Sequence, residues 1–151
     1  MKKSVNKISA LILMAAILLC GCQTDDSNTD ISEYYEGLSK AQEIEVISAS
    51  GSDIIATLSE KKDIADFILA LDMEHWEMNA LPKTAEVVGN VSFSQEETIK
   101  FGETATDGEM RSVCEMLCYE GIPYLTMKVA GLKMTFKIPD ETAEYLMAYF
   151  D

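Results

Sequence analysis

The sequence is poor in the residues that most enzymes use as a general base. His75 is the only histidine among 151 residues, and histidine is the side chain that most often activates a nucleophile. The sequence also lacks a Gly-x-Ser-x-Gly elbow, a His-Glu-x-x-His zinc pair, a phosphate-binding glycine loop and a calcium-binding loop. It therefore gives no support to a serine hydrolase, a zinc peptidase or a nucleotide-binding site. We expect no metal and no cofactor.

The start of the chain has no apolar run long enough to span a bilayer, which takes about 20 residues of helix. Its apolar stretch covers residues 8–19 and is interrupted only by Ser9. Basic residues precede this stretch, and the small residue Gly21 follows it. A basic start, a short apolar core and a small residue before the cleavage point are typical of an export signal. We therefore predict that residues 1–21 are a signal peptide.

The end of this segment, Leu19-Cys20-Gly21-Cys22, resembles the lipobox of bacterial lipoproteins. The resemblance implies that the Cys22 thiol carries diacylglycerol, that the chain is cleaved after Gly21, and that the new amino terminus can be acylated. Cys20 is an unusual residue for the tolerant position, but Leu19 is too large to precede a cleavage at Cys20. Two or three acyl chains hold a protein stably in a membrane, whereas one does so only marginally. The expected location is the extracytoplasmic face of the cell membrane.

The charge of the mature chain is strongly negative. Removing residues 1–21 takes away three lysines and no acid, which leaves 9 of the 12 basic residues against 26 acidic ones and a formal charge of −17. Such a charge repels nucleic acid and anionic lipid headgroups. After Cys22, the segment 22–30 contains no apolar residue and is predicted to be a flexible tether. We expect a domain held near the membrane, with no nucleic-acid partner.

Only two cysteines, Cys114 and Cys118, remain for the folded domain. Four residues along a strand separate Cα atoms by about 13 Å, whereas a disulfide needs them within about 7 Å. We therefore predict two buried free thiols that pack as small apolar residues. They make a poor metal site, because structural zinc takes four ligands and only His75 could assist.

Residues 31–151 are predicted to form a single α+β domain. Two helices show a clean apolar stripe with i, i+3, i+4, i+7 spacing, and we predict that Ser59 is the N-cap of one and Asp140 the N-cap of the other. A shorter helix is expected at 31–38, begun by Asp30. The two stripes consist of Ile64, Phe67, Ile68 and Leu71, and of Ala143, Leu146, Met147 and Phe150.

Alternating or β-branched runs predict the strands. One hairpin joins residues 43–47 to 54–58, and another strand follows Pro82 at 87–94. Ile99 and Phe101 are expected on a returning strand. Residues 110–119 fit either a helix or a strand, and the flanking hairpins favour a strand.

The hairpin around Ala130-Gly131 has a register that turn and pattern both specify. An even-length turn pairs Val129 with Leu132, and the apolar residues of both strands then share one face, which we expect to lie in the core. The other pairs on this face are Met127 with Met134 and Leu125 with Phe136.

The predicted fold class is thus α+β, with an antiparallel sheet built from hairpins and covered by two amphipathic helices. The order of hairpin, helix, strands and closing helix is similar to that of small uncharacterised lipoproteins of Gram-positive gut bacteria. This resemblance rests on no signature residue and implies no activity.

The same register places a basic, aromatic-edged surface on the outer face of the last hairpin. It pairs Tyr124 with Lys137, and Lys128 with Lys133, around a Thr–Thr pair. Two lysines directly opposite each other destabilise a sheet. Either neighbouring acidic strands neutralise them, or the face binds an anionic partner.

The leading hypothesis is a non-catalytic, lipid-anchored domain that binds an envelope protein or an envelope polymer. The alternative is a small envelope enzyme that uses carboxylates or His75. A deep pocket that holds His75 and at least two acids would favour the enzyme. We expect His75 on a surface loop and Trp76 packed over the edge of the core.

Overall fold

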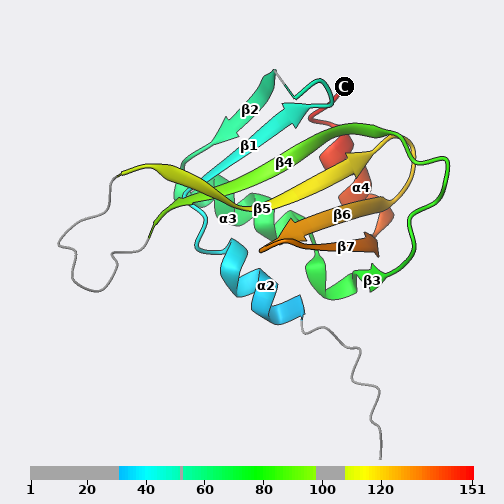
Figure 1. Cartoon of the computed structure of the whole chain (residues 1–151), viewed down its shortest axis with the longest axis horizontal. Helices are drawn as coiled ribbons and strands as arrows, with labels where there is room; N and C mark the ends of the chain where they lie inside the picture. Colours follow the sequence, from blue (N-terminus) through cyan, green and yellow to red (C-terminus); the bar gives the residue numbers. More distant parts are fainter. Residues whose placement is uncertain (1–30, 52, 98–107) are drawn as a thin grey trace, which may run out of the picture.

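The computed structural model describes residues 31–51, 53–97 and 108–151. The predicted signal peptide, the anchor residue Cys22 and the tether lie outside these residues, as do Asp30, Ile99 and Phe101. The described chain forms one seven-stranded sheet in which every neighbouring pair is antiparallel (Figure 1). The strand order is β2-β1-β4-β5-β6-β7-β3. The strands are β1 (Glu43–Ser48), β2 (Ile54–Leu58), β3 (Glu77–Met78), β4 (Val87–Glu96), β5 (Met110–Tyr119), β6 (Tyr124–Val129) and β7 (Leu132–Lys137).

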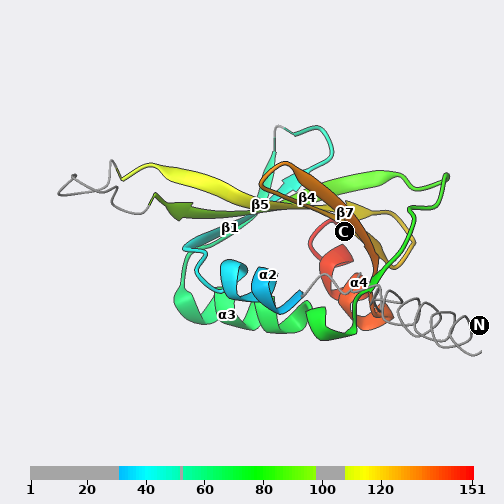
Figure 2. The same ribbon diagram turned by 60° about the horizontal axis from the view of Figure 1, so that its bottom comes forward.

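All helices of the described chain cover the same face of this sheet (Figure 2). They are α2 (Ile31–Leu38), α3 (Lys61–Ala70) and α4 (Asp140–Met147), and a single 3₁₀ turn, Met73–His75, follows α3. The α+β class is confirmed. The two predicted amphipathic helices are α3 and α4, and the predicted short helix α2 lies on the same side of the sheet. Within the described residues, no helix has the length and apolar character needed to cross a membrane.

The core lies between this helical layer and the sheet. Phe67 of α3 is fully buried and contacts Phe93 of β4, with ring centroids 6.0 Å apart, and Tyr145 of α4 at 5.6 Å. The apolar stripe of α3 is buried as predicted. In the stripe of α4 only Leu146 is fully buried, while its other members pack against the edge of the core.

Two predictions about helix starts are wrong. Helix α3 begins after Glu60, not Ser59, and helix α4 begins after Pro139, so that Asp140 is its first residue. Neither start has a side-chain capping hydrogen bond. The acidic residues of the first turns, Asp63 in α3 and Asp140 in α4, instead lie where they favour the helix dipole.

The predicted register of the β6–β7 hairpin is confirmed for every pair. Residues 110–119 are a strand, which pairs with β4 and β6. One residue of the hairpin departs from the expectation. Leu132 was expected in the core, but its side chain is 57% exposed because it lies at the turn, beyond the part of the sheet that the helices cover.

Burial makes the two thiols of β5 unreactive, and this gives a first testable prediction. Cys114 and Cys118 are free and buried, and burial raises the pKa of each thiol to about 12. At pH 8 only about one thiol in ten thousand would then be the reactive thiolate. We expect Ellman's reagent to detect neither thiol in the folded domain and both after denaturation in guanidinium. Recovery of a Cys114–Cys118 disulfide from native protein would contradict this placement.

Candidate functional site

Among the described residues, no second layer covers the face of the sheet opposite the helices (Figure 2). Strand alternation decides which side chains occupy it, since residues next to a core residue in a strand point to the other side. In β6, Leu125 and Met127 are buried in the core. Tyr124, Thr126 and Lys128 therefore lie on the open face. We call the part of this face on β6 and β7 that carries Tyr124, Lys128, Lys133 and Lys137 the basic face.

The structure brings the four predicted residues of the basic face together in two cross-strand pairs. Tyr124 lies opposite Lys137, and Lys128 lies opposite Lys133. Lys133 and Lys137 are exposed, whereas Tyr124 and Lys128 are half-buried. The two pairs lie on either side of the Thr126–Thr135 pair.

The lysines of the basic face differ in their charge partners. Lys128 Nζ is 3.2 Å from Glu115 Oε2 on the adjacent strand β5, so the predicted neutralisation by an acidic neighbour holds for this residue. This ion pair relieves the repulsion between Lys128 and Lys133. Among the described residues, neither Lys133 nor Lys137 forms an ion pair within 4.0 Å. The charge available to a partner is therefore mainly that of Lys133 and Lys137.

A chain of three hydrogen-bonded hydroxyl groups lies at the centre of the basic face. The Tyr119 hydroxyl is 2.7 Å from Thr126 Oγ1, which is 2.9 Å from Thr135 Oγ1. Thr126 is fully buried although it lies on the open side of the sheet. A buried hydroxyl with two partners is satisfied and fixes the relative position of three strands. The polar chain gives Lys133 and Lys137 a rigid base.

Acidic residues limit the extent of the basic face. Glu115 lies beside it on β5, and Glu77 of β3 is the direct neighbour of Lys137 across the β3–β7 pairing. These two carboxylates, of which Glu77 is exposed and Glu115 half-buried, favour a small anionic group that reaches between them over an extended polyanion.

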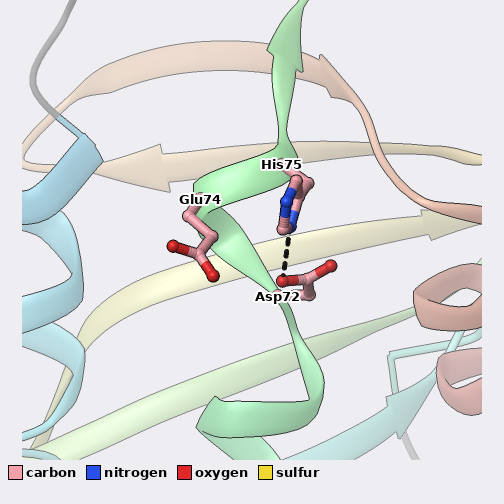
Figure 3. Close-up of side chains that lie close together, drawn as sticks. All are labelled: Asp72, Glu74 and His75. Atoms are coloured by element: carbon pink, nitrogen blue, oxygen red, sulfur yellow. Dashed lines mark hydrogen bonds and ion pairs between the residues drawn. The ribbon is translucent and has the colours of Figure 1, made fainter.

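His75 lies elsewhere, in the 3₁₀ turn after α3, and its side chain is exposed as predicted (Figure 3). Its Nδ1 is 2.7 Å from Asp72 Oδ1. This hydrogen bond and the negative charge of Asp72 raise the pKa of His75 above its usual value. Asp72 can accept the bond because it adopts a left-handed conformation, with φ of 49°, which Asp tolerates better than most residues.

The neighbouring Trp76 anchors this turn to the core, as the sequence predicted. Trp76 is 5% exposed, its Nε1 donates to the Leu71 carbonyl at 2.7 Å, and its ring packs against Phe136. Thr142 of α4 donates to the same carbonyl at 3.3 Å. With Trp76 held inward, the adjacent His75 projects into solvent.

Asp72, Glu74 and His75 together are a group that the sequence reasoning missed. Each offers one ligand atom, and these atoms all lie within 4.8 Å of one another. An imidazole and two carboxylates are suitable ligands for a divalent metal, but a closed zinc site takes four. Of the three residues only Asp72 is partly buried, and His75 lines neither of the two cavities that flank α2. The cluster could have been suspected from the spacing of Asp72, Glu74 and His75 in one turn.

Comparisons with known proteins place the chain in no family. No protein-family model matches the sequence, and no curated protein matches it. Its structure is similar to the crystal structure of a thioesterase-like protein from Clostridium sporogenes ATCC 15579, with 13% sequence identity and a TM-score of 0.45. The match covers 75% of this chain and 96% of that chain. A likeness of this degree carries no activity over to the present chain.

Proposed function

We propose that the chain is a lipid-anchored, extracytoplasmic binding module, and that its basic face holds an acidic segment of an envelope protein. The observation that carries this proposal is the exposure of Lys133 and Lys137, without ion-pair partners among the described residues, on a sheet face that no helix covers. The resemblance of Leu19-Cys20-Gly21-Cys22 to a lipobox supports the anchored part of the proposal, and an anchored domain would meet such a partner at the extracytoplasmic face of the membrane.

The spacing of the two lysines defines the acidic segment. Lys133 and Lys137 lie on the same face of β7, four residues apart, which separates their Cα atoms by about 13 Å. Two acids at i and i+4 of an extended peptide have the same separation. Tyr124, opposite Lys137, adds an aromatic surface with a polar hydroxyl, a residue type enriched in protein interfaces.

A protein partner fits the charge of the domain better than a polymer does. The mature chain carries a formal charge of −17, which repels a long polyanion along most of its length. A folded partner can instead present two or three acids to Lys133 and Lys137 and keep the rest of its surface neutral or basic.

Charge reversal of the basic face is expected to abolish this contact without unfolding the domain. Each Lys→Glu change replaces an attraction of about 0.5–1 kcal/mol by a repulsion of similar size, so Lys133→Glu with Lys137→Glu should weaken binding at least about tenfold. The matched control, Lys61→Glu with Lys83→Glu, changes net charge equally at exposed positions outside β6 and β7. Lys137→Glu places a carboxylate opposite Glu77, whereas Lys133→Glu places one opposite Lys128, so the two changes have opposite effects on cross-strand charge pairing. The free energy of unfolding of both double variants should therefore stay within about 1 kcal/mol of the parent value, since each exposed substitution changes it by about 0.5 kcal/mol or less.

The contact can be measured in membranes by placing a photo-crosslinking benzoylphenylalanine at Tyr124 of the anchored protein. We expect a crosslinked peptide rich in Asp and Glu, lost in the Lys133/Lys137 variant and kept in the Lys61/Lys83 variant. The same crosslinker at Tyr35, which is 44% exposed on α2, should not yield this peptide. A crosslinked product that contains no peptide would contradict the proposal. So would a crosslink whose yield both double variants reduce equally.

A further inference from the structure

An apolar groove lies on the helix-covered side of the sheet, between α2 and the β6–β7 turn, two segments that lie side by side in Figure 1. Its volume is about 420 Å³. Leu38 and Cys114, 3% exposed each, form part of its wall. Its remaining apolar lining comes from Tyr34, Gly37, Val113, Val129, Ala130 and Leu132.

Leu132 shows that this corner of the core is left open. The register places Leu132 opposite Val129, on the side of the sheet where Met127 and Phe136 are buried. Its side chain is nevertheless 57% exposed at the groove. An apolar residue on the core side of a sheet is normally covered, since burying such a side chain contributes about 1.5–3 kcal/mol.

The size and lining of the groove favour a small ligand over a protein segment. A stable protein contact buries about 800 Å² on each partner, whereas cavities of about 300–1,000 Å³ hold small molecules. Among the described residues, Lys40 and Gln95 are the polar residues that line the groove beside its apolar walls. A ligand for this site is therefore apolar over most of its length and anionic or hydrogen-bonding at one end.

We propose that the groove between α2 and the β6–β7 turn binds a single acyl chain with an anionic head, such as a long-chain fatty acid. The Lys40 ammonium is 3.0 Å from Glu36 Oε1, but both side chains are well exposed, at 64% and 73%. Exposed pairs of this kind contribute little. Lys40 can therefore exchange Glu36 for the carboxylate of a ligand, while the chain lies against Leu38, Val129 and Leu132.

The position of α2 fits a ligand that comes from the membrane. Helix α2, which forms one wall of the groove, begins at Ile31, nine residues after Cys22. Nine residues reach at most about 30 Å, so an anchor at Cys22 would keep the groove close to the bilayer surface. The closeness of the groove to the bilayer rests on the proposed anchor, whereas the groove itself does not.

The test uses residues 22–151 expressed without the predicted signal peptide and with Cys22→Ser, a protein that carries no lipid and retains the whole core from Leu38 to Leu146. The probe is dansylaminoundecanoic acid, whose fluorescence rises in apolar surroundings, and dodecanoate is the competitor. We expect the probe to bind and dodecanoate to displace it. No rise in fluorescence, or a rise that dodecanoate does not reverse, would overturn the proposal.

Two variants locate the binding. Leu132→Asp puts a carboxylate at the groove, and Gly37→Phe fills it with a ring from α2, where an added Cβ atom meets no atom within 4 Å. Both should bind the probe at least about tenfold more weakly, since a carboxylate or a ring then occupies the path of the chain. The matched control Leu69→Asp changes a leucine that is 72% exposed on α3, and it should bind like the parent. Equal binding by all variants would overturn the proposal.

The protein's own lipid is the competing occupant. If the mature lipid-bearing protein fails to take up the probe while the Cys22→Ser protein binds it, the groove holds the protein's own acyl chain. The proposal of an external ligand would then be overturned. Because the fluorescence titration uses protein without a lipid, a failure of the anchor assignment leaves its result unaffected.

Discussion

Replacing Cys22 by Ser is expected to abolish lipidation and to leave the precursor uncleaved. The reason is chemical, because the lipid is transferred to a thiol and the lipoprotein peptidase acts after that transfer. The variant should incorporate no labelled palmitate and should migrate as the longer precursor. We expect lipidation to be lost entirely, and with it the two or three acyl chains that supply the stable attachment to the membrane.

The matched control for this experiment is Cys20→Ser, two residues earlier in the chain. Serine suits the tolerant position of the lipobox, so this variant should be lipidated and cleaved like the parent. Normal labelling of Cys22→Ser, or loss of labelling in Cys20→Ser alone, would move the anchor to Cys20 and contradict the assignment.

Replacing Phe67 by Ala is expected to have the largest effect on stability. The Phe67 side chain is fully buried and joins three elements, because its ring contacts Phe93 of β4, Tyr145 of α4, and Tyr149 just after α4. Truncating such a residue leaves a cavity and costs about 3–5 kcal/mol. That is a large part of the roughly 5–15 kcal/mol by which a domain of this size is stable. Urea denaturation followed by circular dichroism measures the loss.

Leu69→Ala, two residues along the same helix, is the control for this prediction. Leu69 is 72% exposed, and alanine favours a helix at least as well as leucine. Its effect should stay within about 0.5 kcal/mol. A similar loss of stability in both variants would show that α3 does not pack through Phe67.

The elements that sequence reasoning predicted best are those in which two independent signals coincide. In the β6–β7 hairpin, the even-length turn and the alternation of apolar residues specify one register, and the structure has that register. In α3, the spacing of Ile64, Phe67 and Ile68 alone identified the buried face. These signals are local, because the side-chain periodicity of a single helix or strand determines which residues are buried.

The features that sequence reasoning missed depend on contacts between distant segments. Nothing local shows that α2 completes the helical layer or that the layer ends before Leu132. Thr126 was expected to be one of an outer Thr–Thr pair, but Tyr119 from β5 closes over it. The contact of Asp72 with His75 needs a left-handed residue, which the sequence does not specify for Asp. The basic face was found because it follows from register alone, whereas the Lys128–Glu115 pair also needs the position of β5.

The mass of the amino-terminal peptide of the protein extracted from membranes decides whether the domain is anchored through Cys22. The binding proposal requires the domain to be displayed outside the cell on a lipid at Cys22. We predict a peptide that begins at Cys22 and carries the added mass of diacylglycerol, with or without a further acyl chain. A mature terminus at any other residue, or an unmodified peptide that still contains residues 1–21, would contradict the account.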